Sequence, residues 1–236
     1  LNDGYDATDP IRVARFTIRD YHAKKRWLSV PEIFMYSSNI GTVKMALDVG
    51  IPGHKQFLSK LGMMKTVGIE LSETGTPLSP NHWREINSMT ISFGHGLAVS
   101  PLHLVAGVSA IVNGGIYRTP TLIRRNAMDP PVGKRVISEE TSLKMRRLMR
   151  LVVEQGTGRK AAAPGYLVGG KTGTAEKVSG HGYKRKALIS SFVAAFPMNQ
   201  PRYVVLAMLD EPTGTKDTFG YATGGWVAAP VIGAVV

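Results

Sequence analysis

Two apolar segments near the end of the chain are joined by only five residues. Residues 188–196 and 202–209 are rich in Val, Leu, Ala and Phe, and the link between them, residues 197–201, has a proline at each end. A link this short leaves no room for a helical crossover, so the two segments must pair as antiparallel strands. The pattern predicts an antiparallel sheet in the last third of the chain.

Helical patterns fill most of the earlier part. Ser100 is expected to cap a helix that ends at a glycine pair, residues 114–115, and Ser138 one that reaches about residue 155. Residues 10–30 suit a short hairpin, Pro31 suits the first turn of a helix, and two further helices are expected to meet near Gly50. Residues 224–236 also look helical.

The fold class predicted from these patterns is α/β in the broad sense (α+β), with helices before an antiparallel sheet. One domain is expected over residues 1–236, mainly helical in 1–160 and mainly strands in 161–236. At 43% hydrophobic and 19% charged residues, the chain has enough apolar material for a core. It begins with Leu, so we expect a piece of a longer protein, with any membrane anchor outside these residues.

The net charge is +12, which favours an acidic partner such as nucleic acid, anionic lipid or an acidic wall polymer. The basic residues are scattered, and aromatic residues are not interleaved with them as a base-stacking surface requires. Nucleic acid is therefore not an expected partner. The chain has no cysteine, which suits an oxidising compartment without proving one.

Two short motifs carry chemistry. Lys171, Thr172 and Gly173, followed by Thr174, form a K-T-G sequence on a predicted strand, and residues 37–39 form an S-x-N sequence at a break between predicted helices. These are two of the three parts of a serine acyl-transferase site, whose third part is S-x-x-K. No Ser stands three positions before a Lys in this chain; Thr141 and Thr174 stand in such a position. The substrate-holding part is therefore predicted without its nucleophile.

Each residue type has a chemical reason to be in such a site. Acyl transfer from a peptide that ends in a carboxylate needs a cation and hydroxyl groups to hold that carboxylate. It also needs a hydroxyl or amine to relay a proton, an amide side chain to orient the peptide bond, and backbone amides for the oxyanion. A glycine beside a strand edge leaves those amides unobstructed.

Further segments occur in the order seen in one known family. They are residues 36–46, 92–102, 156–158, 168–177, 191–196 and 225–231. Together they resemble the transpeptidase domain of class B penicillin-binding proteins, most of all the cell-division type that makes septal peptidoglycan. The resemblance extends over essentially the whole chain and implies the penicillin-binding, serine β-lactamase-like fold, with its amino-terminal part missing here.

The resemblance implies a D,D-transpeptidase that cross-links peptidoglycan stem peptides ending in D-alanyl-D-alanine. It implies β-lactam antibiotics as inhibitors, cell-division membrane proteins as partners, and a place on the periplasmic face of the bacterial inner membrane. No cofactor or metal is implied. The family's S-x-x-K helix lies before the S-x-N motif, so these 236 residues alone are expected to be inactive.

Roles in the site follow from the same resemblance. Ser37 is expected to relay the proton, and Lys171 to add positive field and support the relay. Asn39 is expected to orient the donor amide. Thr172 and Thr174 are expected to hold the substrate carboxylate, the Thr174 amide to form half of the oxyanion hole, and Gly173 to let substrate lie along the strand.

Several alternatives remain open. Residues 165–172 also match a phosphate-binding P-loop, although no strand pattern precedes them and glycines follow where a helix should begin. A non-catalytic β-lactam sensor on the same fold, a carboxypeptidase or a β-lactamase would carry the same motifs. His95 and His103 lack metal-ligand spacing and are expected to be structural, whereas Lys177 and the basic residues 184–186 are candidates for shaping a loop beside the motif.

Overall fold

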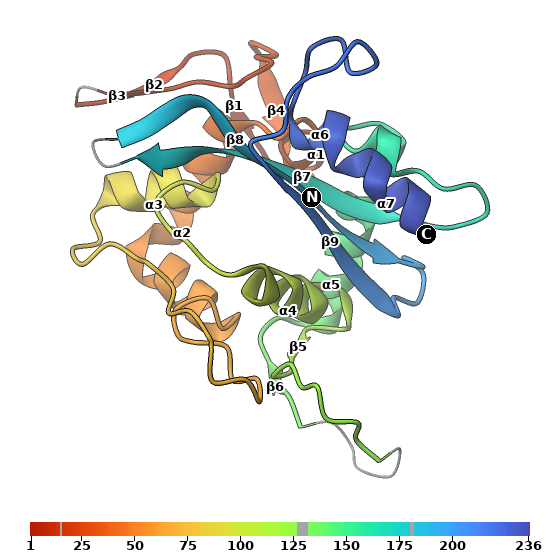
Figure 1. Cartoon of the computed structure of the whole chain (residues 1–236). Helices are drawn as coiled ribbons and strands as arrows, with labels where there is room; N and C mark the ends of the chain where they lie inside the picture. Colours follow the sequence, from red (N-terminus) through yellow and green to blue (C-terminus); the bar gives the residue numbers. More distant parts are fainter. Residues whose placement is uncertain (15, 127–131, 180–181) are drawn as a thin grey trace. The chain divides into compact units, whose positions relative to one another are not determined.

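The two apolar segments lie side by side as antiparallel strands in the computed structural model, which describes residues 1–14, 16–126, 132–179 and 182–236 (Figure 1). Three strands form one sheet in the order β7 (Gly169–Ser179), β8 (Gly182–Phe196) and β9 (Tyr203–Asp210). Both pairings are antiparallel, with Thr172 opposite Phe192 and Phe192 opposite Ala207. The predicted antiparallel sheet is confirmed.

The chain forms two units that interleave along the sequence. Unit 1 comprises Leu1–Asp3, Ser29–Ser37 and Arg146–Val236, and unit 2 comprises Gly4–Leu28 and Ser38–Met145. The K-T-G strand and Ser37 therefore belong to the same unit although they are far apart in sequence.

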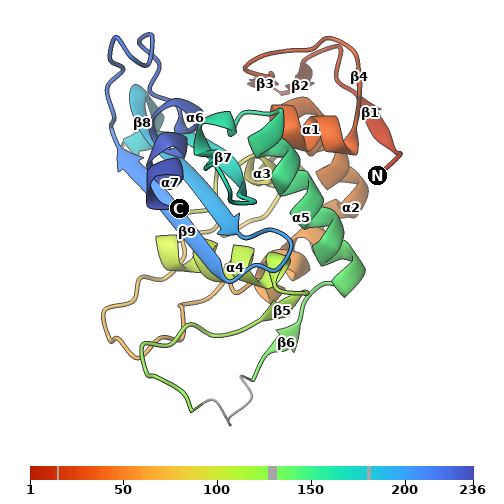
Figure 2. The ribbon, with the colours of Figure 1, turned by 90° about the vertical axis from the view of Figure 1, so that its right-hand side faces the viewer.

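One face of the sheet in unit 1 packs against the end of the chain. Side chains alternate along a strand, so Phe192 and Ala194 of β8 point to the same face, which α6 (Gly224–Val227) and α7 (Ala229–Val235) cover. Figure 2 shows these two helices on one side of the strands. The fully or almost fully buried residues of this core are Val153, Ala161, Val168, Phe192, Ala194, Ala207, Ala228, Ala229 and Ile232.

The opposite face of β7 receives α1 (Val30–Tyr36) and the last part of α5 (Glu139–Glu154). The Arg150 guanidinium on α5 donates to the Val168 carbonyl, 2.8 Å away, and so fastens the helix to the start of β7. The Lys171 ammonium lies 5.8 Å from the centre of the Phe34 ring on α1. A short 3-10 turn, η1 (Arg159–Ala161), follows α5.

Within the described residues, unit 2 contains the other helices and three pairs of short strands, except that Ser29 at the end of β4 belongs to unit 1. Its helices are α2 (Asn39–Lys60), α3 (Glu85–Ser92) and α4 (Pro101–Val112). Ile18, Val43 and Met89 form one buried cluster between a hairpin strand, α2 and α3. The strand pairs are β1 (Gly4–Asp6) with β4 (Trp27–Ser29), β2 (Ile11–Val13) with β3 (Phe16–Ile18), and β5 (Ile116–Tyr117) with β6 (Lys134–Arg135).

Most predicted elements are present with small shifts in their ends. The expected hairpin in residues 10–30 is the β2–β3 pair. The Ser100 hydroxyl caps α4, and the Ser138 hydroxyl accepts the Thr141 amide at the start of α5. The two helices expected to meet near Gly50 are confirmed, because the chain leaves helical geometry at Gly50, where φ is +70° and ψ is +165°, so α2 consists of two helices joined at a kink. The helical end divides into α6 and α7 at Ala228.

The sequence patterns missed α3 and several of the two- and three-residue strands. The residue that precedes α3 is Arg84, which supplies none of the usual capping signals of Ser, Thr, Asp or Asn. In the part of the chain that the structure describes, no helix is both long enough and apolar enough to span a bilayer.

The buried ring of Phe192 should be the main support of the sheet. We expect Phe192→Ala to lower the free energy of unfolding by about 3–5 kcal/mol, because the ring is 0% exposed and its loss leaves a cavity. Phe219→Ala is the matched control, since that ring is 77% exposed and its loss should change little. Denaturant unfolding of both variants measures the difference, and equal costs would contradict the assigned core.

Candidate active site

Ser37 owes its position to the end of α1. The helix starts with a capping box, in which the Ser29 hydroxyl accepts the Glu32 amide and the Glu32 carboxylate accepts the Ser29 amide. Ile33 and Met35 anchor the helix with buried side chains. At its end Ser37 adopts the left-handed conformation, φ +59° and ψ +47°, which costs a residue other than glycine about 1–2 kcal/mol. Such strain is common at functional sites, and here it orients the exposed Ser37 hydroxyl.

The Ser37 hydroxyl is paired with the K-T-G lysine. Lys171 Nζ donates to Ser37 Oγ over 2.7 Å, although the two residues are 134 positions apart. Lys171 Nζ also lies 3.3 Å from the Thr172 carbonyl oxygen. Burial lowers the pKa of Lys171 to about 8, because the charged ammonium is poorly solvated. At pH 7 the amine is therefore mostly charged, yet it can release a proton far more easily than an exposed lysine can.

β7 presents different groups on its two faces. Lys171 and Gly173 point to one face, whereas Thr172 and Thr174 point to the face that α6 covers. The Thr174 hydroxyl oxygen accepts the backbone amide of Gly224 at 3.0 Å. The Thr172 hydroxyl lies 2.8 Å from the hydroxyl of Thr157, in the turn after α5. Both threonine oxygens are thus fixed by groups of unit 1.

The outer edge of β7 carries the backbone groups of the motif. β7 is the last strand of its sheet, and no strand within the described residues pairs with its outer side. The amides and carbonyls along that side can form a ladder with an added extended peptide. Gly173 lies in the middle of the motif strand, where an added Cβ atom would lie 2.6 Å from the Ser191 hydroxyl oxygen of β8.

Asn39 is described within unit 2, at the first turn of α2. Its side-chain amide donates to the Arg19 carbonyl over 2.8 Å. The neighbouring Ser38 is only 3% exposed, and its hydroxyl accepts the Gly41 amide and donates to the Asp20 carboxylate. Ser38 therefore has a structural role. Asp20, which also accepts the Ile40 amide, was missed because no local sequence signal links it to a motif 18 residues later.

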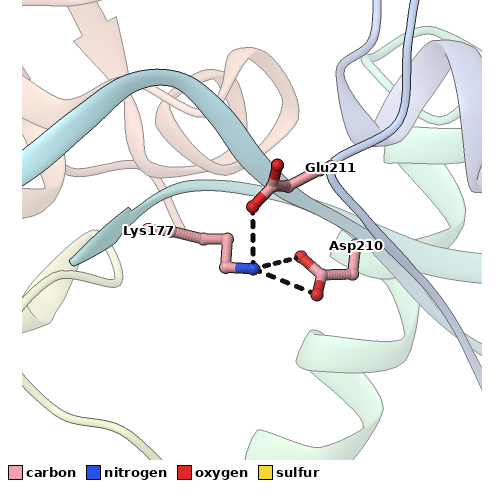
Figure 3. A network of polar contacts seen from close by, with 3 residues as sticks. All are labelled: Lys177, Asp210 and Glu211. Atoms are coloured by element: carbon pink, nitrogen blue, oxygen red, sulfur yellow. Dashed lines mark hydrogen bonds and ion pairs between the residues drawn. The ribbon is translucent and has the colours of Figure 1, made fainter. Parts of the chain in front are cut away.

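Lys177 is bound in an ion-pair cluster, shown in Figure 3. Its ammonium lies 2.9 Å from Asp210 and 3.0 Å from Glu211, at the end of β9. The hydrogen bonds to Asp210 and then to Glu211 raise the pKa of Lys177. The cluster joins the two outer strands beside a bulge between Glu176 and Lys177, and so fixes the end of the straight part of β7. The side chains of residues 184–186 lie outside those that the structure describes.

The P-loop alternative does not fit the structure, and His103 is buried with hydrogen-bonding partners. A P-loop requires a helix directly after Lys171 and Thr172, whereas these residues lie within the strand β7. His103 is 2% exposed, and its ring nitrogens lie 2.7 Å from the Ser100 hydroxyl and 2.8 Å from the Lys65 carbonyl oxygen. Over the described ranges, no group of three or more His, Cys, Asp or Glu residues could hold a metal ion.

The family model of the penicillin-binding protein transpeptidase domain matches residues 2–236. The chain belongs to this family. The fold is the penicillin-binding transpeptidase fold that the resemblance implied, with helices and an antiparallel sheet. The S-x-N and K-T-G motifs both lie within it.

Curated relatives of this transpeptidase domain are longer proteins. A probable peptidoglycan D,D-transpeptidase FtsI from Caulobacter vibrioides is 44% identical over 98% of this chain, which covers 41% of that relative. The peptidoglycan D,D-transpeptidase FtsI from Escherichia coli K12 is 33% identical over 97% of this chain, which covers 38% of it. The chain thus spans about two fifths of the length of these relatives.

Solved structures agree with this assignment. The transpeptidase domain of Burkholderia pseudomallei penicillin-binding protein 3 has a TM-score of 0.89 and 34% identity, covering 99% of this chain and 70% of that one. Penicillin-binding protein 3 from Mycobacterium tuberculosis, solved with ampicillin, has a TM-score of 0.88 and 27% identity over 99% of this chain and 55% of that one.

Lys171 of the transpeptidase domain should titrate far below an ordinary lysine. We expect its amine to lose its proton as the pH rises through about 8, because burial disfavours the charged form. Between this pH and the ordinary pKa of 10.5, the folded protein binds fewer protons than the unfolded chain. The free energy of unfolding therefore increases as the pH rises through that window, because the cost of burying the charged amine is removed. Carbon NMR of labelled lysine measures the midpoint, with Lys171→Arg to assign the signal. A midpoint above 10 would contradict the prediction.

Proposed function

We propose that this chain supplies the substrate-holding part of a serine D,D-transpeptidase that cross-links peptidoglycan stem peptides. The observation that carries the proposal is the hydrogen bond between Ser37 Oγ and Lys171 Nζ, beside the open edge of β7. It brings a hydroxyl and a poorly solvated amine together next to a strand that can receive an extended peptide. The names of the curated relatives support the same reaction.

The nucleophile is a serine of an S-x-x-K segment outside these 236 residues. It attacks the penultimate D-alanyl carbonyl, forms an acyl-enzyme and expels D-alanine, and a second stem's amine then takes up the acyl group. The expelled amine needs a proton, and Ser37 passes one on while it exchanges hydrogen bonds with Lys171. An amine whose pKa is about 8 suits this step, because it can gain or lose a proton near neutral pH.

The K-T-G strand holds the donor peptide. Thr172 and Thr174 donate their hydroxyl hydrogens to the terminal carboxylate, and the Lys171 charge adds a favourable field. The backbone amide of Thr174 forms half of the oxyanion hole, and the peptide lies along β7 past Gly173. Asn39 orients the donor amide, a role carried over from the S-x-N motif.

β-Lactams occupy the same site because they imitate the donor terminus. The penicillin-binding protein 3 of Mycobacterium tuberculosis, solved with ampicillin and with aztreonam, supports this ligand class. We further propose that the whole protein acts in cell division, on the periplasmic face of the inner membrane, with division membrane proteins as partners. The similarity to two FtsI proteins supports this placement.

A fluorescent penicillin tests the proposal. The full-length protein should be labelled covalently, and the 236 residues alone should not be, because they contain no S-x-x-K serine. Gel fluorescence after denaturation measures the labelling. An unlabelled full-length protein would contradict the proposed reaction, and labelling of the isolated chain at a serine would contradict the placement of the nucleophile.

Ser37 should matter for the rate of labelling. We expect Ser37→Gly in the full-length protein to slow acylation by about 10²-fold or more, because the relay hydroxyl is lost. Glycine accepts the positive φ of this position, so the change removes the hydroxyl without straining the backbone. Stopped-flow measurements give the acylation rate constant. A decrease of less than about threefold in Ser37→Gly would mean that a group other than the Ser37 hydroxyl relays the proton.

A further inference from the structure

Thr157 lies next to the motif without a role in the reaction described so far. It occupies the turn between α5 and η1, and its hydroxyl lies 2.8 Å from that of Thr172, with either oxygen able to donate. Both residues belong to unit 1. The pair therefore joins the K-T-G strand to a separate turn.

The turn that carries Thr157 is closely packed on both sides. A Cβ atom added to Gly158 would lie 2.7 Å from the buried Phe192 ring. A Cβ atom added to Gly225, on α6, would lie 2.5 Å from the Thr157 carbonyl oxygen. The Thr157 backbone is thus held between the core of unit 1 and α6, and this packing fixes the place from which its hydroxyl reaches Thr172.

The direction of the hydrogen bond follows from what Thr172 has to do. A hydroxyl carries one hydrogen, and a carboxylate can only accept. If Thr172 gives its hydrogen to a bound carboxylate, its bond to Thr157 can persist only with Thr157 as the donor. We propose that Thr157 is a positioning residue that holds the Thr172 hydroxyl with its hydrogen turned to the substrate carboxylate. This inference rests on the proposed function.

The Thr174 hydroxyl is also an acceptor of a hydrogen bond from a fixed donor. Its oxygen accepts the Gly224 amide, so its hydrogen is also free for a ligand. Thr157 thus does for Thr172 what a backbone amide does for Thr174. Two donors fixed before the ligand arrives need no reorientation when the anion binds, which favours both its affinity and its alignment.

Removal of the Thr157 hydroxyl tests the role in the full-length protein. Thr157→Val has nearly the same shape and cannot donate, whereas Thr157→Ser keeps the donor as the matched control. Acylation rate constants are measured with benzylpenicillin, which carries a carboxylate, and with its methyl ester, which does not. We expect Thr157→Val to slow the first reaction by about three- to tenfold and to leave the second within about twofold of the native rate. Thr157→Ser should retain the native ratio of the two rates.

The ratio of the two rates separates positioning from simple damage. If Thr157→Val leaves the ratio of the two acylation rates unchanged, the inference is overturned. It is also overturned if Thr157→Ser lowers that ratio as Thr157→Val does. Thermal unfolding checks that the variants are folded, and Thr157→Ala provides a second hydroxyl-free variant should the valine disturb the turn. A native protein that reacts with neither ligand would refute the proposed function itself, which is a different result.

Discussion

The hydrogen bond between Lys171 and Ser37 joins two segments that the sequence keeps far apart, and the candidate site of unit 1 depends on it. It requires α1 to end in a left-handed serine and β7 to turn its lysine towards that end. Burial of the amine then weakens its hold on its proton. The packing of one short helix on one strand thus decides both where the two groups meet and how acidic the lysine is.

The alternation of a β-strand explains how one motif can supply three kinds of group. Lys171 points to one face of β7, and Thr172 and Thr174 point to the other. Every second residue of β7 turns its backbone amide and carbonyl away from β8, to the side with which no described strand pairs. Consecutive residues thereby offer a cation, hydroxyls and backbone amides without any loop having to close.

Local signals account for what could be predicted from the sequence. A five-residue link fixed the antiparallel direction of β8 and β9, and serine caps located α4 and α5. The motif residues were found because their order resembles a known family. The roles of Asp20 and Thr157 depend on contacts with residues far along the chain or on another element, so no local pattern reveals them. The role of Asn39 remains a prediction from its motif.

The open side of β7 also has a consequence for the behaviour of the protein in solution. A strand edge that accepts a peptide accepts the edge of another molecule equally well, which makes it a starting point for aggregation. The excess of 12 positive charges opposes such encounters, because two copies of the chain repel each other while an oppositely charged partner is attracted. The basic composition therefore opposes edge-to-edge pairing between copies of the chain, although β7 has no paired strand on its outer side among the described residues.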